Sequence, residues 1–350
     1  MAIEMATKQK TGMSVRWIWI AAIIIALVVG TVGGYFYGNY VGSQSLAKSP
    51  TQVRMGITPY SMYSAMIQNF QEVRDKWTAA ETKYNVKFTW AWPEEDVTTF
   101  FYGGVDVIAV GALEAAEMKY NRDYETYVFG ILNWNEDVFI VRGNSTYQSL
   151  NDLKGKKLAH FGWDSGAVKF AELLVKKDFN LNLTTDFEWV VAPPDVCVEL
   201  LNNGDVEAAL VYSTPWTYGV AHYGMRILYG PFTETWKALT GDRGLANEGL
   251  VTTKQMLDNH PEVAKAIIEG CSATRDFFIA NTTRGYQYYH GSYSPEQKAA
   301  FNAIYPPDVY FPIPGPLTQG IIDSEFQSLT MAYELGLLDK QPTKDIFFTY

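Results

Sequence analysis

The chain has few of the residues that most often build metal centres or catalytic sites. It contains two cysteines and four histidines in 350 residues. Two cysteines do not make a disulfide framework, and the sequence has no Cys-x-x-Cys motif or Cys/His cluster, which argues against a zinc site. Cys197 and Cys271 fall in predicted helices, so we expect two free, buried thiols. No nucleophile–His–acid arrangement or phosphate loop stands out, so we expect no cofactor, no metal and no catalytic residue.

Positive charge is also scarce. The net charge is −10, with 28 Lys and Arg against 38 Asp and Glu. Nucleic-acid binding needs clustered basic residues, so DNA and RNA are not expected partners. Hydrophobic residues make up 47% of the chain and aromatic residues 15%, which is enough for two cores of ordinary domain size.

Charge is absent altogether between Arg16 and Lys48, and residues 17–37 form one apolar run. At about 1.5 Å per residue, a helix of this length just spans the hydrocarbon core of a bilayer. Basic residues precede the run and only Glu4 opposes them, so the positive-inside tendency places residues 1–16 in the cytoplasm and the later residues outside. We therefore predict a transmembrane anchor at 17–40 and a linker at 41–52.

Two other interpretations of the N-terminus stay open. The apolar run is longer than the core of a usual secretory signal peptide, although Ser45-Leu46-Ala47 is a weak cleavage candidate. Lys10-Thr11-Gly12-Met13 before the run resembles the pilin-type signals of some archaeal binding proteins, but Arg16 interrupts that pattern. A retained anchor is the interpretation we favour.

One pattern occurs twice in the remaining sequence. Residues 101–111 and residues 201–211 each read as a helix end, a glycine stop, an acidic residue and a short apolar strand. Each strand then runs into a loop of small or aromatic residues. Because open α/β sheets bind ligands at the carboxyl ends of their strands, the repeat predicts two similar α/β lobes whose loops face each other across a cleft.

The order of predicted elements extends this interpretation. Strands at 53–57, 86–90 and 106–110 alternate with helices, which implies a parallel sheet with right-handed crossovers. Two extended segments follow at 127–132 and 138–141. Gly143-Asn144-Ser145 then breaks the pattern, so we place the first crossing between lobes there and the return near residue 249.

Taken in order, these segments resemble the solute-binding proteins of ABC transporters in the nitrate/sulfonate/taurine group. The resemblance covers residues 51–350. Each motif is weak alone, and the resemblance rests on the order and spacing of all of them. The motifs are Arg54-Met55-Gly56, Gly104-Val105-Asp106-Val107, Leu150-Asn151-Asp152-Leu153-Lys154-Gly155-Lys156, Gly204-Asp205-Val206-Glu207-Ala208 with Pro215, Asn259-His260-Pro261-Glu262 and Glu334-Leu335-Gly336-Leu337-Leu338.

The resemblance implies a periplasmic-binding-protein type II architecture, in which each α/β lobe is a mixed, mostly parallel sheet flanked by helices. Lobe one would comprise residues 53–142 and 249–350, and lobe two residues 143–248. The lobes would close on a small-molecule ligand by a hinge motion and deliver it to the permease subunits of an ABC transporter. An external tether fits this role because it keeps the receptor near its transporter.

The resemblance also carries ligand-binding loops over to this sequence. The residues expected to contact ligand are Pro59, Tyr60, Ser61, Gly111, Ala112, Trp134, Trp163, Asp164, Ser165, Thr214 and Trp216. Several loops precede helices, whose free N–H groups favour a sulfonate or carboxylate. Yet the loops carry no Arg, Lys or His, and rings with carboxylates suit a neutral or nitrogenous organic ligand, such as an amine or a pyrimidine. We favour the second class, while Trp216 and Asp164 also have structural explanations as core packing and a helix cap.

Two rival functions use the same architecture. An enzyme is disfavoured because the pyrimidine-making relatives of this shape use a cysteine-rich stretch that the sequence lacks, and because an external tether suits a metabolic enzyme poorly. A surface sensor that binds ligand without transport is the other rival. With only residues 1–16 before the predicted anchor, a cytoplasmic signalling region is not expected.

Overall fold

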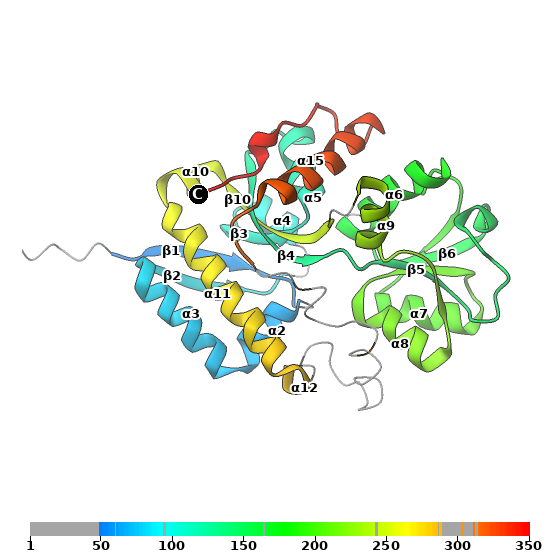
Figure 1. Cartoon of the computed structure of the whole chain (residues 1–350), viewed down its shortest axis with the longest axis horizontal. Helices are drawn as coiled ribbons and strands as arrows, with labels where there is room; N and C mark the ends of the chain where they lie inside the picture. Colours follow the sequence, from blue (N-terminus) through cyan, green and yellow to red (C-terminus); the bar gives the residue numbers. More distant parts are fainter. Residues whose placement is uncertain are drawn as a thin grey trace, which may run out of the picture. The chain divides into compact units, whose positions relative to one another are not determined.

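β1 (Thr51–Gly56) starts the first of two five-stranded sheets, with strand order β2-β1-β3-β10-β4 (Figure 1). β1 pairs in parallel with both of its neighbours, and β10 runs antiparallel to its two neighbours, so the sheet is mixed. The other strands of this sheet are β2 (Val86–Ala91), β3 (Val107–Val110), β4 (Thr126–Trp134) and β10 (Ala246–Thr253).

The computed structural model describes residues 49–350, apart from residues 60, 94–95, 164, 242–243, 286, 289–302, 304–310 and 312–313. The predicted anchor at 17–40 and most of the linker lie outside the described residues. Among those described, no helix combines the length and the apolar character needed to cross a membrane.

Helices cover both faces of the first sheet because its buried strands are apolar on both sides. Val107 and Ala109 face one core with α2, α3 and α11, whereas Ile108 and Val110 face the other core with α4, α5 and α15. Figure 1 shows α3 and α11 side by side, in keeping with their extensive contact. The elements of this part are α2 (Met62–Asn69), α3 (Gln71–Tyr84), α4 (Asp96–Phe101), α5 (Ala112–Ala116), the π-helix η1 (Glu117–Asn121), α10 (Lys254–Asn259), α11 (Pro261–Ala280), α12 (Thr282–Gly285) and α15 (Gln319–Glu334).

The second sheet has strand order β7-β6-β8-β5-β9 and is layered in the same way. β6 is parallel to β7 and β8, and β5 is antiparallel to β8 and β9. Its strands are β5 (Val138–Val141), β6 (Lys157–His160), β7 (Glu188–Val191), β8 (Ala208–Val211) and β9 (Arg226–Tyr229). Its helical elements are the short 3₁₀ helix η2 (Leu150–Leu153), α6 (Gly166–Phe179), α7 (Pro194–Asn203), α8 (Ser213–Tyr223) and α9 (Phe232–Thr240).

The predicted two-lobed α/β fold is therefore confirmed, and so is the repeated unit. Gly204 adopts a left-handed backbone (φ 83°) that ends α7 before β8, and residues 103–104 separate α4 from β3 in the same way. Both cysteines are free and buried, as expected.

One boundary differs from the prediction. β5 pairs in the second sheet, so the chain first crosses at residues 135–137 and not at 143–145. The physical reason is that Val138–Val141 is a short apolar strand that continues the pattern of β4. Its antiparallel partners, β8 and β9, are far away in the sequence, and nothing local identifies them.

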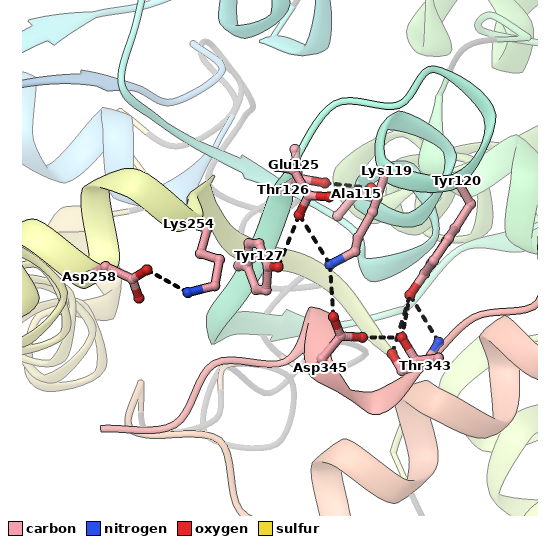
Figure 2. A network of polar contacts seen from close by, with 10 residues as sticks. All are labelled: Ala115, Lys119, Tyr120, Glu125, Thr126, Tyr127, Lys254, Asp258, Thr343 and Asp345. Carbon is pink, nitrogen blue, oxygen red and sulfur yellow. Dashed lines mark hydrogen bonds and ion pairs between the residues drawn. The ribbon is translucent and has the colours of Figure 1, made fainter.

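The end of the chain is held against the first sheet. Phe348 donates its N–H to the carbonyl of Val128 in β4 (2.8 Å). Lys119 of η1 lies over the ring of Tyr127 and pairs with Asp345 in the short 3₁₀ helix η3 (Lys344–Ile346), with an Nζ–Oδ2 distance of 3.2 Å (Figure 2). These contacts fix the C-terminal segment over the edge strand β4, which leads to the crossing.

Candidate ligand-binding site

Three polar residues link the two sheets directly. Asn135, Glu136 and Asp137 connect β4 to β5, and each is at most 2% exposed. The Asn135 N–H donates to the carbonyl of Leu245 (2.8 Å), which lies just before the returning strand β10. The Asn135 side-chain oxygen accepts the N–H of Asp137 (3.1 Å). The two crossings are thus held together at the hinge, and the first of them contains the pair of acids.

Asp137 is the most deeply buried acid of this group. Within the described residues, neither of its carboxylate oxygens has a hydrogen-bond partner in the structure. Burial raises the pKa of Asp137 well above its usual value, and repulsion from Glu136 raises it further, whereas the neighbouring Asn135 side chain opposes the shift. A buried acid without a matching cation is costly, which is the situation expected where a ligand supplies the missing partner.

Glu248 in β10 adds a third carboxylate on the first sheet. Burial, with repulsion from Asp96 and Glu136, raises the pKa of Glu248 to about 8, and the Ser61 hydroxyl opposes this shift. Unlike Glu136 and Asp137, Glu248 retains partial exposure. Glu248 is therefore repelled by the buried Glu136 while part of the residue stays exposed.

The arrangement is an acidic cluster at the hinge, made of Glu136, Asp137 and Glu248. The strongest charged influences on Asp137 and Glu248 are other acids, including Glu114. Such a cluster favours a positively charged group, because a cation relieves the repulsion and lowers the cost of ionising buried carboxylates. An anion placed against the same cluster would be repelled.

The lobe-one residues predicted from sequence lie at strand ends and helix starts. Ser61 caps α2 by accepting the Tyr63 N–H (3.3 Å). Pro59 is half-buried and accepts the Ser64 hydroxyl (3.0 Å). Gly111 precedes α5 and donates its N–H to Glu114 (2.7 Å), and Ala112 begins that helix in a buried position.

Trp134 is half-buried at the end of β4, immediately before the acidic cluster. Its ring packs closely on Gly244, where an added Cβ would lie 2.7 Å from a ring carbon. This contact joins the two crossing segments. Of the predicted aromatic residues, Trp134 is the nearest to Glu136 in the sequence.

The predicted residues of the second lobe are more scattered. Ser165 is the N-cap residue of α6. Trp163 is 36% exposed and packs on the ring of His160 (centroid distance 4.2 Å). It lines a groove of about 490 Å³ together with Glu117, Lys169 and Glu172. This groove contains none of the hinge acids.

Trp216 in α8 is 1% exposed and belongs to the core that includes Cys197 and Val198 of α7. Its contact with ligand stays a prediction, as do those of the other residues named from sequence. Thr214 lies in the first turn of α8. Tyr60 and Asp164 fall outside the described residues.

Sequence reasoning missed the acids at the hinge. Glu136 and Asp137 form an acidic pair between two apolar strands, and Glu248 stands just before the apolar end of β10. An acid pair at that position, where the chain passes from one strand directly into another, was the available signal. Glu114 was missed because it resembles an ordinary helix residue.

Comparisons with known proteins agree with this architecture. A family model described as "ABC transporter, phosphonate, periplasmic substrate-binding protein" matches residues 55–222, slightly less than half of the chain. No curated protein matches the sequence.

Solved structures with the same fold include two sulfonate-binding proteins. The alkanesulfonate-binding protein SsuA from Xanthomonas axonopodis pv. citri, bound to MOPS, is 14% identical with a TM-score of 0.66, covering 86% of this chain and 99% of that one. The periplasmic aliphatic sulphonate-binding protein SsuA from Escherichia coli is 15% identical with a TM-score of 0.64, covering 86% and 94%. A ligand-binding component of an ABC-type import system from Staphylococcus aureus, with zinc bound, is 14% identical with a TM-score of 0.58, covering 85% and 96%.

These findings confirm the resemblance predicted from the sequence. The chain has the periplasmic-binding-protein type II fold and matches a family of periplasmic substrate-binding proteins of ABC transporters. Two of these structures are described as sulfonate-binding proteins and the third as having zinc bound, so the shared fold does not by itself identify the ligand of this chain.

Proposed function

We propose that this protein is a membrane-tethered, extracytoplasmic solute-binding protein, which captures a small organic solute between its lobes and delivers it to the permease of an ABC transporter. The fold and the family match support the solute-binding role. The uncharged run at 17–37 supports the tether, with residues 1–16 in the cytoplasm. The lobes would close about the crossings at 135–137 and 244–246.

The acidic cluster at the hinge is the reason for the class of ligand that we propose. Two buried carboxylates and one partly buried carboxylate repel one another, beside the half-buried ring of Trp134. A protonated amine or another nitrogenous cation would neutralise this charge and stack on an aromatic face. We therefore propose a cationic or nitrogenous organic solute in preference to a sulfonate or carboxylate.

A thermal-shift panel of the full chain in detergent tests this function. The panel contains alkyl amines, aminopyrimidines, alkanesulfonates and small carboxylates of matched size. We expect at least one nitrogenous cation to raise the melting temperature in a concentration-dependent way, because a ligand that binds the folded state stabilises it by mass action.

Stabilisation by sulfonates or carboxylates alone would contradict the proposed ligand class. Chemical turnover of the stabilising compound would instead support an enzyme on this fold. The Asp137→Asn variant is the matched test of the site, because it removes the buried charge while keeping the size of the side chain. It should lose most of the stabilisation by the cation.

The tether is tested separately. The full chain should stay in the membrane fraction after alkaline carbonate extraction, and a chain that starts at Pro50 should be released. Release of both chains would contradict a retained anchor, and an N-terminus that begins after residue 12 or after residue 47 in the mature protein would favour a processed signal.

A further inference from the structure

Glu114 belongs to α5 of the first lobe, but its side chain contacts the start of α6 in the second lobe. Its Oε2 accepts the Gly111 N–H (2.7 Å). The same carboxylate lies against Gly166, the first residue of α6 in the second lobe. A Cβ added at Gly166 would lie 2.5 Å from Oε2 and 2.8 Å from the carboxyl carbon. The absence of a side chain at Gly166 is what allows this approach.

The start of α6 favours a negatively charged partner, and no residue of its own first turn supplies one. α6 runs for 14 residues, so its N-terminal N–H groups and dipole favour a negative partner. Its first turn, Gly166-Ala167-Val168-Lys169, contains no acid, and the Ser165 side chain makes no capping hydrogen bond. Backbone hydrogen bonding from Gly166 instead favours the charged form of Glu114.

The charged groups around Glu114 come from three elements. Glu117 of η1 repels it, and Lys169 of α6 attracts it, while Glu248 and Asp137 lie within its electrostatic reach. Lys169 also pairs with Glu117 (3.2 Å), which forms a second link between the lobes. Glu114 is partly buried, and burial raises the pKa of its carboxyl to about 7 in spite of the two backbone hydrogen bonds.

We propose that Glu114 is an internal anion that occupies the position at the start of α6 where a ligand's sulfonate or phosphonate group would otherwise bind. Helix N-termini bind such groups in many proteins through the same N–H groups and dipole. With the position filled from the opposite lobe, the receptor rejects anionic solutes and keeps its cleft for cationic or neutral ones. This inference rests on the proposed solute-binding function and assigns Glu114 the role of a specificity-determining residue.

The inference separates this chain from the sulfonate-binding proteins that share its fold. Those proteins are described as binding alkanesulfonates or aliphatic sulphonates. Here an acid at position 114 lies against the glycine at position 166, so a carboxylate already faces the start of α6. Removing the Glu114 carboxylate should therefore restore anion binding without any change in the fold.

The test compares ethanesulfonate, inorganic sulfate and inorganic phosphate as probes of the full chain in detergent at pH 8, where the Glu114 carboxyl is mostly ionised. Isothermal titration is carried out on the wild type and on Glu114→Ala, Glu114→Gln and Glu117→Gln. Glu117→Gln is the matched control, because it removes an acid that pairs with Lys169 in the same first turn but leaves the Glu114 carboxylate against Gly166. Circular dichroism confirms that each variant unfolds cooperatively.

We expect negligible binding of all three anions to the wild type and to Glu117→Gln, and a gain of at least tenfold in affinity for one of them in Glu114→Ala. Glu114→Gln should show a smaller gain, because the amide fills the space without the charge. The inference is overturned by wild-type binding of ethanesulfonate equal to that of Glu114→Ala, or by no gain in either folded Glu114 variant. Either result leaves the cation panel intact as a separate test of the proposed function.

Discussion

The raised pKa of Glu248 links its burial among acids to the binding of a cation. Burial among other acids raises its pKa to about 8, so near neutral pH a large share of the molecules carry it protonated. A cationic ligand favours the ionised form and must therefore displace that proton. The strength of cation binding is then tied to pH through a group that remains partly exposed.

We predict that affinity for the cation identified in the panel rises from pH 6 to pH 8 by roughly tenfold, because deprotonation of Glu248 completes the negative site. Glu248→Gln should lower the affinity at pH 8 by a similar factor and flatten the pH dependence. Titration calorimetry at three pH values measures both effects. Glu334→Gln, which removes an exposed acid at the end of α15, is the control and should keep the wild-type profile.

Individual site residues were the hardest feature to predict from the sequence. Ser61 caps α2, and a serine before a helical apolar pattern is a local signal of such a cap. The local signal of Glu136 and Asp137 is only an acidic pair between two apolar strands. Their importance comes from burial at a crossing between two sheets, which depends on strand pairing that the local sequence does not encode.

At the scale of elements, local patterns predicted the strands and helices well. β3 and β8 follow glycine stops and consist of apolar residues, so their positions could be read directly. The sheet to which β5 belongs could not, because antiparallel partners are chosen by tertiary packing. The same limit explains why the sequence did not predict the contact of the C-terminal segment with β4.

That contact depends on Lys119, whose side chain is 8% exposed between Asp345, Glu125 and the ring of Tyr127 (Figure 2). Replacing it with alanine leaves Asp345 without this partner and removes the cation–π contact. We predict that Lys119→Ala lowers the free energy of unfolding by about 1–2 kcal/mol in urea titrations.

Lys254→Ala is the control for this prediction, because Lys254 forms an exposed pair with Asp258 four residues along the chain. Such pairs contribute little, so its effect should stay below about 0.5 kcal/mol. Equal losses in the two variants would show that Lys119 is an ordinary surface residue and that the C-terminal segment is held by other contacts.

At the scale of the whole molecule, several buried acids make folding depend on pH. Glu325 in α15 is 1% exposed and accepts the Ala246 N–H (2.7 Å), and burial raises its pKa to about 8. Glu114 and Glu248 are raised to about 7 and 8. Because each pKa is higher in the folded state than in the unfolded state, the folded chain binds more protons between about pH 4.5 and pH 8.

The ligand-free protein should therefore lose stability as the pH rises through that range. We predict a lower melting temperature at pH 8 than at pH 5, with Glu325 alone contributing on the order of 2 kcal/mol. Glu325→Gln should reduce this difference, and scanning calorimetry of both chains at the two pH values measures it. A melting temperature that increases towards pH 8 in the wild type would contradict the raised pKa values.

The central claim is that an acidic cluster between the lobes receives a positively charged solute. Calorimetric titration of the full chain with the stabilising ligand, at pH 7 in two buffers of different ionisation enthalpy, counts the protons exchanged on binding. The account predicts that binding releases protons, because the ligand's charge lowers the pKa of carboxylates that are partly protonated before it enters. Proton uptake, or binding without any proton exchange, would contradict it.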